Sequence, residues 1–378
     1  MSVVGRMLSN QIRHVLLLIV CCFLFLVSFS SLNATAAGLV IEPLSEATPE
    51  SQGLSSVILR EAVTKINNGE YGRIHSLLIA RNNYLIMEEY FSGYESDDIH
   101  PVYSVTKSIT SALIGIALKQ GKINSLDTKL LEFFPEYAKI ENLDQYKKKI
   151  SLKNVLTMTA GFQWDESSIP WFDPLNDARK MSESYDSIKY VLDLPMSDPP
   201  GKFVYNSGCS MLLSGVLKNT TGQSAEEYAN DHLFKQIGIK KWRWSILSIR
   251  SNRMTNTSGG LNLRPIDMAR IGILYLNEGS WLKKQIIPKE WHQVSTKRHV
   301  RVDKEAAYGY QWWIILDNNE RSKDLSIKDA YFAWGWGGQF ILVIPHLNMV
   351  VVSTAENIEN DIIFFNMIRD HVLPAIYD

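Results

Sequence analysis

The chain has 378 residues, enough for one large domain or two modest ones with a substantial core. It carries 39 Lys and Arg against 40 Asp and Glu, a formal net charge of −1, and this balance argues against nucleic acid or another polyanion as a partner. Hydrophobic residues make up 46% of the chain and charged residues 21%, as in an ordinary globular protein.

Residues 1–37 have the pattern of a secretory signal peptide. Basic residues precede a largely apolar run over residues 15–29, and the small residues of Ala34-Thr-Ala36 follow it. We therefore expect an exported protein, periplasmic or secreted, whose mature domain covers residues 38–378. The alternative is an uncleaved anchor, which would give membrane association through residues 15–32.

The next segment contains a helix, a hairpin and a second helix. We expect the first helix over residues 55–68. Strand-like runs at residues 74–80 and 84–91 flank Arg81-Asn-Asn83, which predicts a β-hairpin. A polar loop then leads into an apolar helix that begins near Ser104. A strand pair followed by a buried helix indicates an α/β layer with an antiparallel sheet.

Residues 126–298 show mainly helical and loop-like signals, and we expect them to form an inserted, mainly helical subdomain. The basic run Lys147–Lys149 within it is expected to be a solvated face. The last third returns to strands, and residues 361–376 are expected to form a closing helix. The predicted strand runs lie at residues 308–316, 331–344 and 349–354.

Ser104 and Lys107 lie one helical turn apart at the start of the apolar helix. A serine hydroxyl is a weak nucleophile until a base takes its proton. A lysine in an apolar helix, near the positive end of the helix dipole, has its ammonium form disfavoured and can be that base. The N–H of Ser104 is also free to face a developing oxyanion. The motif is short, however, and Ser280-Trp-Leu-Lys283 repeats it by chance in what the sequence indicates is a surface connection.

Tyr205 is a candidate for the proton-transfer group that a serine–lysine pair needs. It follows a Pro-Pro-Gly turn within Lys202-Phe-Val-Tyr-Asn-Ser-Gly-Cys209, a short polar loop before an apolar helix. A tyrosine in such a loop can face an active site and carry a proton to the leaving group. The alternative is that Tyr205 only caps a turn.

A third candidate segment, Ala333–Ile344, carries glycines and tryptophans ahead of an apolar strand. Glycine in a strand lets a substrate or another backbone approach closely. The N–H of Trp336 would then complete an oxyanion hole with the N–H of Ser104. The alternative is a β-bulge packed by two tryptophans.

Taken in order, Ser104-Val-Thr-Lys107, Tyr205-Asn-Ser207 and Gly335-Trp-Gly-Gly-Gln339 resemble the three motifs of the serine β-lactamase and penicillin-binding-protein superfamily. The likeness covers most of residues 40–378, including Leu156-Thr-Met-Thr-Ala-Gly161. It is strongest to β-lactamase-related serine hydrolases, the branch of class C β-lactamase-like esterases and 6-aminohexanoate-dimer hydrolases. The resemblance implies an α+β, β-lactamase/transpeptidase-like fold, with an antiparallel sheet flanked by helices.

The resemblance also implies a role for each matching residue. Ser104 would be the acylated nucleophile, Lys107 its general base, and Tyr205 the group that shares the proton network and later activates water. The N–H groups of Ser104 and Trp336 would hold the oxyanion. The other residues implied to bind the oxyanion or the substrate are Ser207, Gly337 and Gly338. The resemblance implies no cofactor and no metal.

Two departures from the β-lactamase pattern indicate the substrate class. The position of Ser207 is usually Asn, and Gly335-Trp-Gly-Gly338 lacks the cation that relatives place there. Loss of a charged partner weakens recognition of a carboxylate by roughly 1.5–3 kcal/mol. We therefore expect a serine hydrolase for a small ester or amide lacking that carboxylate, with Trp334 and Trp336 as apolar walls. The alternatives are a β-lactamase or D,D-peptidase and, from another class, a non-catalytic binding or sensor protein of the penicillin-binding type.

Other mechanisms have little support in the sequence. A G-x-S-x-G elbow does not occur, since Gly208-Cys-Ser-Met-Leu212 fails at its last position. The eight histidines lack H-E-x-x-H spacing, and only Cys209 remains after the signal peptide, so we expect neither a zinc site nor an internal disulfide. Asp165 and Glu166 form an acidic pair that we interpret as structural or as part of a pocket rim.

Overall fold

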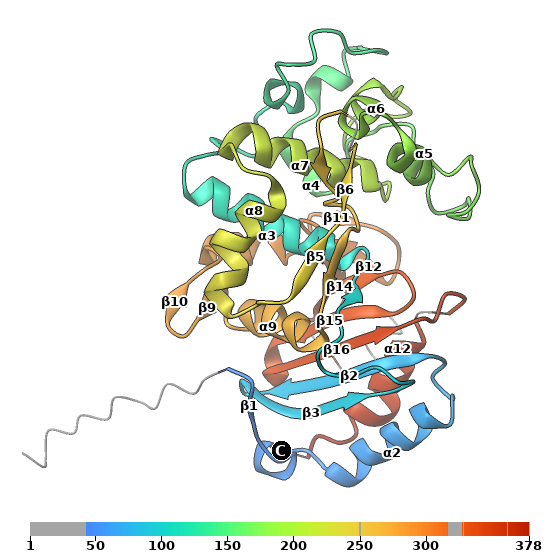
Figure 1. Cartoon of the computed structure of the whole chain (residues 1–378), viewed down its shortest axis with the longest axis vertical. Helices are drawn as coiled ribbons and strands as arrows, with labels where there is room; N and C mark the ends of the chain where they lie inside the picture. Colours follow the sequence, from blue (N-terminus) through green and yellow to red (C-terminus); the bar gives the residue numbers. More distant parts are fainter. Residues whose placement is uncertain (1–42, 249–250, 317–326, 328, 361, 378) are drawn as a thin grey trace, which may run out of the picture. The chain divides into compact units, whose positions relative to one another are not determined.

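The computed structural model describes residues 43–248, 251–316, 327, 329–360 and 362–377. The predicted signal peptide or anchor, residues 1–37, therefore lies outside the described residues. From residue 42 onward the chain clusters as one unit, whose elements are labelled in Figure 1. Within the described ranges, no helix combines the length and the apolar character that crossing a membrane requires.

A nine-stranded sheet organises the described residues (Figure 1). Its strands are β1 (Ser45–Glu46), β2 (Ile74–Arg81), β3 (Tyr84–Tyr90), β11 (Val300–Arg301), β12 (Ala306–Tyr308), β13 (Trp313–Ile315), β14 (Tyr331–Gly335), β15 (Gln339–Ile344) and β16 (Met349–Ala355). The strand order is β1-β3-β2-β16-β15-β14-β13-β12-β11, antiparallel except for the pair β1–β3. Strands from the two ends of the unit thus pair in the middle of one sheet.

The predicted hairpin is confirmed as β2 and β3. Asn82 and Asn83 join the two strands with φ angles of 53° and 68°, the left-handed backbone that a two-residue hairpin turn needs and that asparagine tolerates. Successive side chains of β2 point to opposite faces of the sheet, so Leu77 enters one hydrophobic core and Leu78 the other.

Helices cover both faces of the sheet and complete these two cores (Figure 1). The helices are α2 (Ser56–Asn67) and α12 (Ile363–Met367) on one face, and α3 (Val105–Lys119) and α9 (Pro265–Leu276) on the other. Ser55 caps α2 by accepting a hydrogen bond from the N–H of Ile58. The predicted helix over residues 55–68 and the predicted α+β fold class are confirmed.

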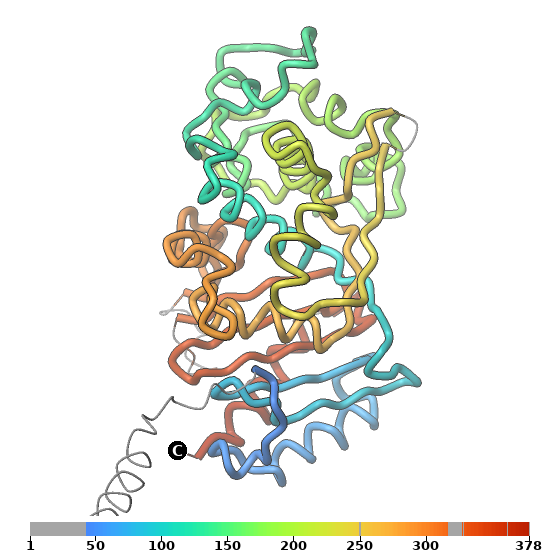
Figure 2. The backbone as a smooth tube through the Cα atoms, turned by 60° about the vertical axis from the view of Figure 1, so that its left-hand side comes forward, coloured from blue at the N-terminus to red at the C-terminus, as the bar shows by residue number. Residues whose placement is uncertain are grey.

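The remaining α-helices and strands lie between β3 and β11 in the chain. The helices are α4 (Leu152–Leu156), α5 (Asp177–Glu183), α6 (Ser187–Asp193), α7 (Ser207–Thr221), α8 (Ala225–Ala229) and α10 (Lys289–Ser295). The short strands are β4 (His100–Pro101), β5 (Trp242–Trp244), β6 (Ile246–Leu247), β7 (Met254–Thr255), β8 (Leu261–Leu263), β9 (Ser280–Trp281) and β10 (Lys284–Gln285). Figure 2 shows the green part of the tube, with α4 to α6, at the opposite end of the unit from the blue α2.

Helix α9 falls within the predicted insert, residues 126–298, yet it lies on the sheet. Gly272 of α9 approaches Val350 of β16 so closely that a Cβ on the glycine would lie 2.4 Å from the valine Cγ1. Part of the sequence assigned to the insert therefore belongs to the layer that covers the sheet.

Three predicted elements differ from the structure. The strand expected over residues 308–316 is interrupted between β12 and β13, where Gln311 has a φ of 63° that extended chain does not adopt. The run expected over residues 331–344 forms the hairpin of β14 and β15. The closing helix is α-helical only to Met367 and continues as a π-helical turn to Val372.

Lys147 corrects another expectation, because it does not belong to a solvated face. Its side chain is fully buried, and Nζ donates to the carbonyl oxygens of Glu141 and Leu192 at 2.7 Å each. Burial lowers the pKa of Lys147 to about 8, because the charged form loses its hydration. A run of basic residues in the sequence does not indicate which of them the tertiary structure buries.

Candidate active site

Ser104 is the N-cap residue of α3, and Lys107 lies in the first turn, as predicted. The preceding Tyr103 has a φ of 44°, a left-handed backbone that a bulky residue adopts only where its surroundings impose it. One such constraint comes from Val102, whose N–H donates to the carbonyl oxygen of Leu261 in β8 at 3.0 Å. A strained turn between a strand and a helix thus positions Ser104.

Lys107 is 1% exposed, and its side-chain nitrogen makes three short contacts. Nζ lies 2.9 Å from Ser104 Oγ, 3.1 Å from Ser207 Oγ and 2.5 Å from the carbonyl oxygen of Ser258. Burial lowers the pKa of Lys107 to about 8, while the negative charge of Glu166 acts in the opposite direction. Near neutral pH a much larger fraction of Lys107 is therefore uncharged than of a solvated lysine. The uncharged amine lies within hydrogen-bonding distance of the Ser104 hydroxyl.

Tyr205 lies beside Ser104 and Lys107, so the structure brings the three predicted catalytic residues together. Lys107 Nζ lies over the Tyr205 ring, 5.1 Å from its centroid. Burial and the charge of Glu166 raise the pKa of Tyr205 far above its ordinary value, while a side-chain hydrogen bond with Ser104 acts to lower it. At neutral pH Tyr205 is thus a neutral phenol, and Lys107 is the group that loses its proton more readily.

The third predicted segment lies against the turn that precedes Ser104. A Cβ on Gly335 would lie 2.2 Å from the carbonyl oxygen of Val102, so only glycine permits this approach. The ring of Trp336 meets the ring of Tyr103 edge to face, with centroids 5.4 Å apart. Among the backbone hydrogen bonds that the described residues form outside helices and strands, none uses the N–H of Ser104 or Trp336. Both N–H groups are candidate oxyanion donors.

Gly337 and Gly338 shape the turn between β14 and β15. Their φ angles of 80° and 99° are accessible to glycine and strained for other residues. The carbonyl oxygen of Gly338 accepts a hydrogen bond from Ser353 Oγ at 2.8 Å, and Gln339 Nε2 donates to the carbonyl oxygen of Trp336 at 3.1 Å. Among the described residues that line the Ser104 cleft, this turn contributes Trp336 and neither glycine.

Of the acidic pair that we interpret from the sequence as structural or as part of a pocket rim, Glu166 lines the Ser104 cleft and Asp165 does not. The link of Glu166 to Lys107 was not predicted. Its carboxylate accepts hydrogen bonds from Trp164 Nε1 at 2.8 Å, from the Ser207 N–H at 2.8 Å and from Ser207 Oγ at 2.9 Å. Ser207 thereby links Glu166 to Lys107. In the sequence near Glu166, only Trp164 is one of its hydrogen-bond partners. Ser207 is 41 residues away, so local sequence could not indicate that contact. The carbonyl of Ser258, which also holds Lys107, was not predicted either.

Ser104 opens into a cleft of about 700 Å³ that is lined by both aromatic and polar side chains. The tryptophans that line it are Trp171, Trp313, Trp334 and Trp336. Glu166 contributes a carboxylate, and the described lining residues include no Lys, Arg or His. Such a cleft suits an apolar substrate that is neutral or cationic and disfavours an anionic one.

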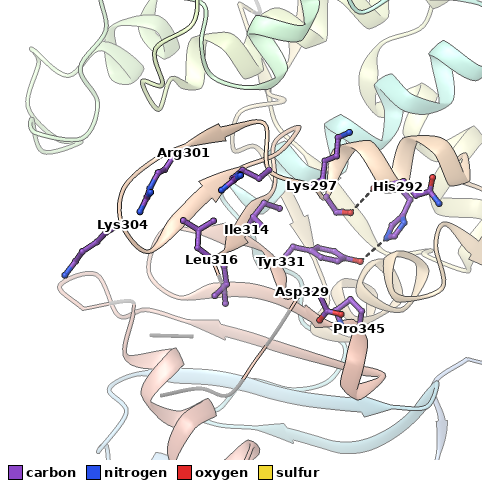
Figure 3. A pocket seen from close by; sticks show the side chains of 13 residues that line it. His292, Lys297, Arg301, Lys304, Ile314, Leu316, Asp329, Tyr331 and Pro345 are labelled. Carbon is purple, nitrogen blue, oxygen red and sulfur yellow. Dashed lines mark hydrogen bonds between the residues drawn. The ribbon is translucent and has the colours of Figure 1, made fainter. Parts of the chain in front are cut away.

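A second cavity, of about 680 Å³, lies beside β11, β13, β14 and α10. Figure 3 shows its lining, with His292 hydrogen-bonded to the hydroxyl of Tyr331 at 3.1 Å and basic side chains such as Arg301 and Lys304 at its edge. No serine or cysteine stands among the described residues that line it. The cavity is similar in size to the Ser104 cleft but lacks a serine–lysine pair, so the candidate active site is the cleft.

A third, smaller cavity of about 170 Å³ shares Tyr103 and Trp336 with the cleft. It contains a buried pair of histidines, His75 and His100, whose Nδ1 and Nε2 atoms lie 2.9 Å apart. Across the part of the chain that the structure describes, His, Cys, Asp and Glu side chains form no group of three or more that could hold a metal ion.

The sheet, its flanking helices and a Ser–Lys–Tyr cluster at the start of a buried helix define a penicillin-binding-protein or β-lactamase-like hydrolase. The chain belongs to the Beta-lactamase family, whose sequence model matches residues 74–356. The predicted family, the β-lactamase/transpeptidase-like fold and the assignment as a serine hydrolase enzyme are thereby confirmed.

Individual relatives agree with this assignment. The 6-aminohexanoate-dimer hydrolase of Paenarthrobacter ureafaciens is 22% identical over 302 residues, which cover 74% of this chain and 72% of the relative. A solved structure from Bacillus anthracis, assigned as a 6-aminohexanoate-dimer hydrolase, superposes with a TM-score of 0.69 at 22% identity and covers 89% of each chain. A penicillin-binding protein from Bacillus halodurans gives a TM-score of 0.62 at 17% identity, over 82% of this chain and 98% of the other. The two solved structures show that the chain shares their fold.

Proposed function

We propose that the protein hydrolyses a small ester or amide through an acyl-enzyme on Ser104. The observation that carries the proposal is the position of the buried Lys107 Nζ, 2.9 Å from Ser104 Oγ. The uncharged amine takes the hydroxyl proton while Oγ attacks the carbonyl carbon, and the N–H groups of Ser104 and Trp336 face the oxyanion. Collapse of the tetrahedral intermediate expels an alcohol or amine and leaves an ester on Ser104.

Tyr205 is the proposed carrier of the proton. Its phenol interacts with the Ser104 hydroxyl, and its ring lies beneath Lys107 Nζ, so a proton taken by the lysine can reach the leaving group through the tyrosine. In the second half of the reaction a water molecule attacks the acyl-enzyme and gives its proton to the same pair of residues. The carboxylic acid leaves and the Ser104 hydroxyl is restored.

The proposed substrate is a small neutral ester or amide. The 6-aminohexanoate-dimer hydrolase relatives favour an amide, and the tryptophans of the cleft favour an apolar acyl or leaving group. A β-lactam or a D,D-peptide carries a carboxylate, and the cleft offers that group the carboxylate of Glu166 and no cation among its described lining residues. The β-lactamase or peptidase alternative is therefore the weaker one.

The labelling experiment uses a fluorophosphonate probe and intact-mass spectrometry. Ser104 Oγ displaces fluoride from the probe, so the wild-type protein is expected to gain the mass of one probe less HF, and Ser104→Ala is expected to gain none. Ser280→Ala is the matched control, because Ser280 belongs to the second S-x-x-K sequence on the hairpin of β9 and β10, and it should label like the wild type. Label that persists in Ser104→Ala contradicts the proposal.

A substrate panel separates the reaction classes. p-Nitrophenyl esters, the matching anilides and nitrocefin report esterase, amidase and β-lactamase activity with Ser104→Ala as the blank. Turnover of esters or anilides without nitrocefin hydrolysis supports the proposal, and nitrocefin as the best substrate contradicts it.

We also propose that residues 1–37 direct export, as their composition predicts. N-terminal sequencing of the protein recovered from periplasmic and membrane fractions tests this. A mature N-terminus near residue 38 supports a cleaved signal peptide, whereas a membrane-bound protein that retains residues 15–32 supports the anchor.

A further inference from the structure

We propose that Glu166 is a positioning residue that aims the lone pair of Lys107 at Ser104, by fixing the direction in which the Ser207 hydroxyl donates its hydrogen bond. The inference rests on the proposed function, since it takes Lys107 to be the base for Ser104. It assigns a task to Glu166 and to Ser207 that the family motifs do not contain, because Ser207 stands where β-lactamases usually carry Asn.

The hydroxyl proton of Ser207 is directed at Glu166. A carboxylate accepts hydrogen bonds and donates none. Glu166 accepts from two N–H groups that cannot reverse, those of the Trp164 indole and the Ser207 backbone, both at 2.8 Å. Its other oxygen accepts from Ser207 Oγ at 2.9 Å, which commits the single hydroxyl proton of Ser207 to Glu166. Toward Lys107, Ser207 Oγ can then only accept.

The side-chain nitrogen of Lys107 has three polar neighbours. An uncharged amine has two N–H bonds and one lone pair. The Ser258 carbonyl oxygen, 2.5 Å from Nζ, only accepts, and Ser207 Oγ, 3.1 Å away, accepts because its own proton is donated to Glu166. These two acceptors occupy both N–H bonds of Lys107. The lone pair is left for the third neighbour, the hydroxyl of Ser104 at 2.9 Å, which is the orientation that proton removal requires.

Without the carboxylate of Glu166, the hydrogen bonds around Lys107 Nζ are no longer fixed in direction. The Ser207 hydroxyl could rotate and donate to Lys107, and it would then compete with Ser104 for the lone pair. The charge of Glu166 has a second effect, because it opposes the lowering of the Lys107 pKa by burial. The carboxylate of Glu166 thus sets both the direction in which Lys107 accepts a proton and the pKa of its ammonium group.

Glu166→Gln tests the direction with nearly unchanged shape. The two fixed N–H donors hold the amide oxygen in place of one carboxylate oxygen, so the amide NH₂ faces Ser207 Oγ and donates to it. The Ser207 proton is then released toward Lys107. We expect kcat/KM for a neutral ester to fall about tenfold to a hundredfold, part of the roughly 10²–10⁴-fold that a positioned base contributes.

The double variant Glu166→Gln with Ser207→Ala should recover part of the lost kcat/KM. No such recovery is expected if Glu166 only stabilises the fold. Removing the Ser207 hydroxyl removes the competing donor, so the kcat/KM of the double variant should exceed that of Glu166→Gln several-fold. A double variant that is weaker than both single variants would mean that Glu166 acts only by holding the fold, and would overturn the inference. Wild-type kcat/KM in Glu166→Gln would overturn it as well.

The pH profile provides a second readout. Removing the charge of Glu166 lowers the pKa of Lys107, so the acidic limb of kcat/KM should move to lower pH in Glu166→Gln. The matched control is Asp165→Asn, which removes the neighbouring carboxylate that accepts from the N–H groups of Ser167 and Ser168 and should leave the limb unmoved. An unmoved limb in Glu166→Gln counts against the inference. Failure of the proposed function is distinguished by Ser104→Ala, which would then keep its turnover.

Discussion

Gly335 approaches Val102 so closely that a Cβ on the glycine would lie 2.2 Å from the valine carbonyl oxygen. The two residues come from opposite sides of the proposed oxyanion hole, since Val102 precedes the turn to Ser104 and Gly335 precedes Trp336. The missing side chain of one residue therefore sets the spacing of the two N–H groups that are expected to bind the oxyanion.

Gly335→Ala should separate these two segments. The added methyl group meets the carbonyl oxygen of Val102, a backbone atom that cannot rotate away. We therefore expect the free energy of unfolding to fall by about 1–3 kcal/mol, with a loss of kcat/KM as Trp336 moves from Ser104. Urea denaturation and ester hydrolysis measure the two effects. Gly259→Ala is the stability control, because its nearest neighbour atom would lie at an ordinary 3.8 Å. Equal stability of the two variants would contradict the argument.

The pH dependence of the wild-type enzyme should report Lys107. Burial lowers its pKa to about 8, and the base is the deprotonated form. We therefore expect kcat/KM for a neutral ester to rise with pH and to reach half its maximum near pH 8. Lys107→Arg keeps the positive charge at every accessible pH and should lose about 10²–10⁴-fold in kcat/KM. A profile that stays flat through this range would show that another group is the base.

Tyr205→Phe removes the phenol and keeps the ring beneath Lys107. Because the proton then lacks its carrier, we expect kcat to fall by about 10²–10⁴-fold. The buried phenol stays protonated, since its pKa is raised far above 10, so the wild-type profile should show no second rise that belongs to Tyr205. Stopped-flow measurement of nitrophenol release shows which half-reaction slows. Wild-type turnover in Tyr205→Phe would remove Tyr205 from the mechanism.

The histidine pair behind Tyr103 should make stability sensitive to acid. Burial, with a smaller effect of His100, lowers the pKa of His75 to about 4, while Arg73 adds to this effect and Glu356 opposes it. An unfolded histidine titrates near 6.5, so between these values the unfolded chain binds more protons. The neutral His75 therefore contributes its full stabilisation to the folded protein above pH 6.5. As the pH falls toward 4, the free energy of unfolding decreases by about 2–3 kcal/mol.

Urea denaturation at a series of pH values measures this loss. His75→Phe should flatten the acidic part of the stability curve, whereas His232→Gln, on the partly exposed turn after α8, should leave it unchanged. A steep acidic loss that survives in His75→Phe would assign the effect to other groups.

The parts of the site that follow from local spacing could be predicted from the sequence. Ser104 and Lys107 share a face because one helical turn separates them. Tyr205 and Trp336 could be placed only by the resemblance of ordered motifs, since no periodicity connects them with Ser104. Glu166 could be placed only as a structural or pocket-rim residue, and its contact with Ser207 could not be predicted, because the local pattern does not determine how these two distant segments fold together.

In the fold, too, local features could be predicted from the sequence, whereas contacts between distant segments could not. The hairpin of β2 and β3 could be predicted from two asparagines between strand-like runs, and α2 from its apolar spacing. The pairing of β16 with β2 joins strands from the two ends of the described unit, and such pairing depends on tertiary packing. The burial of Lys147 depends on the same packing, because its acceptor on Leu192 lies 45 residues away.

The groups around Lys107 are distant in the chain, with Ser207 lying 100 and Ser258 lying 151 residues from it. A partly assembled chain can hold Ser104 beside Lys107 on one helical turn, but it lacks the distant groups that bury and orient the lysine. Reactivity toward a fluorophosphonate therefore becomes a gauge of cooperativity. In a denaturant titration the labelled fraction should change together with tryptophan fluorescence, because Lys107 is buried and oriented only where the segments that carry Ser207 and Ser258 have folded against it.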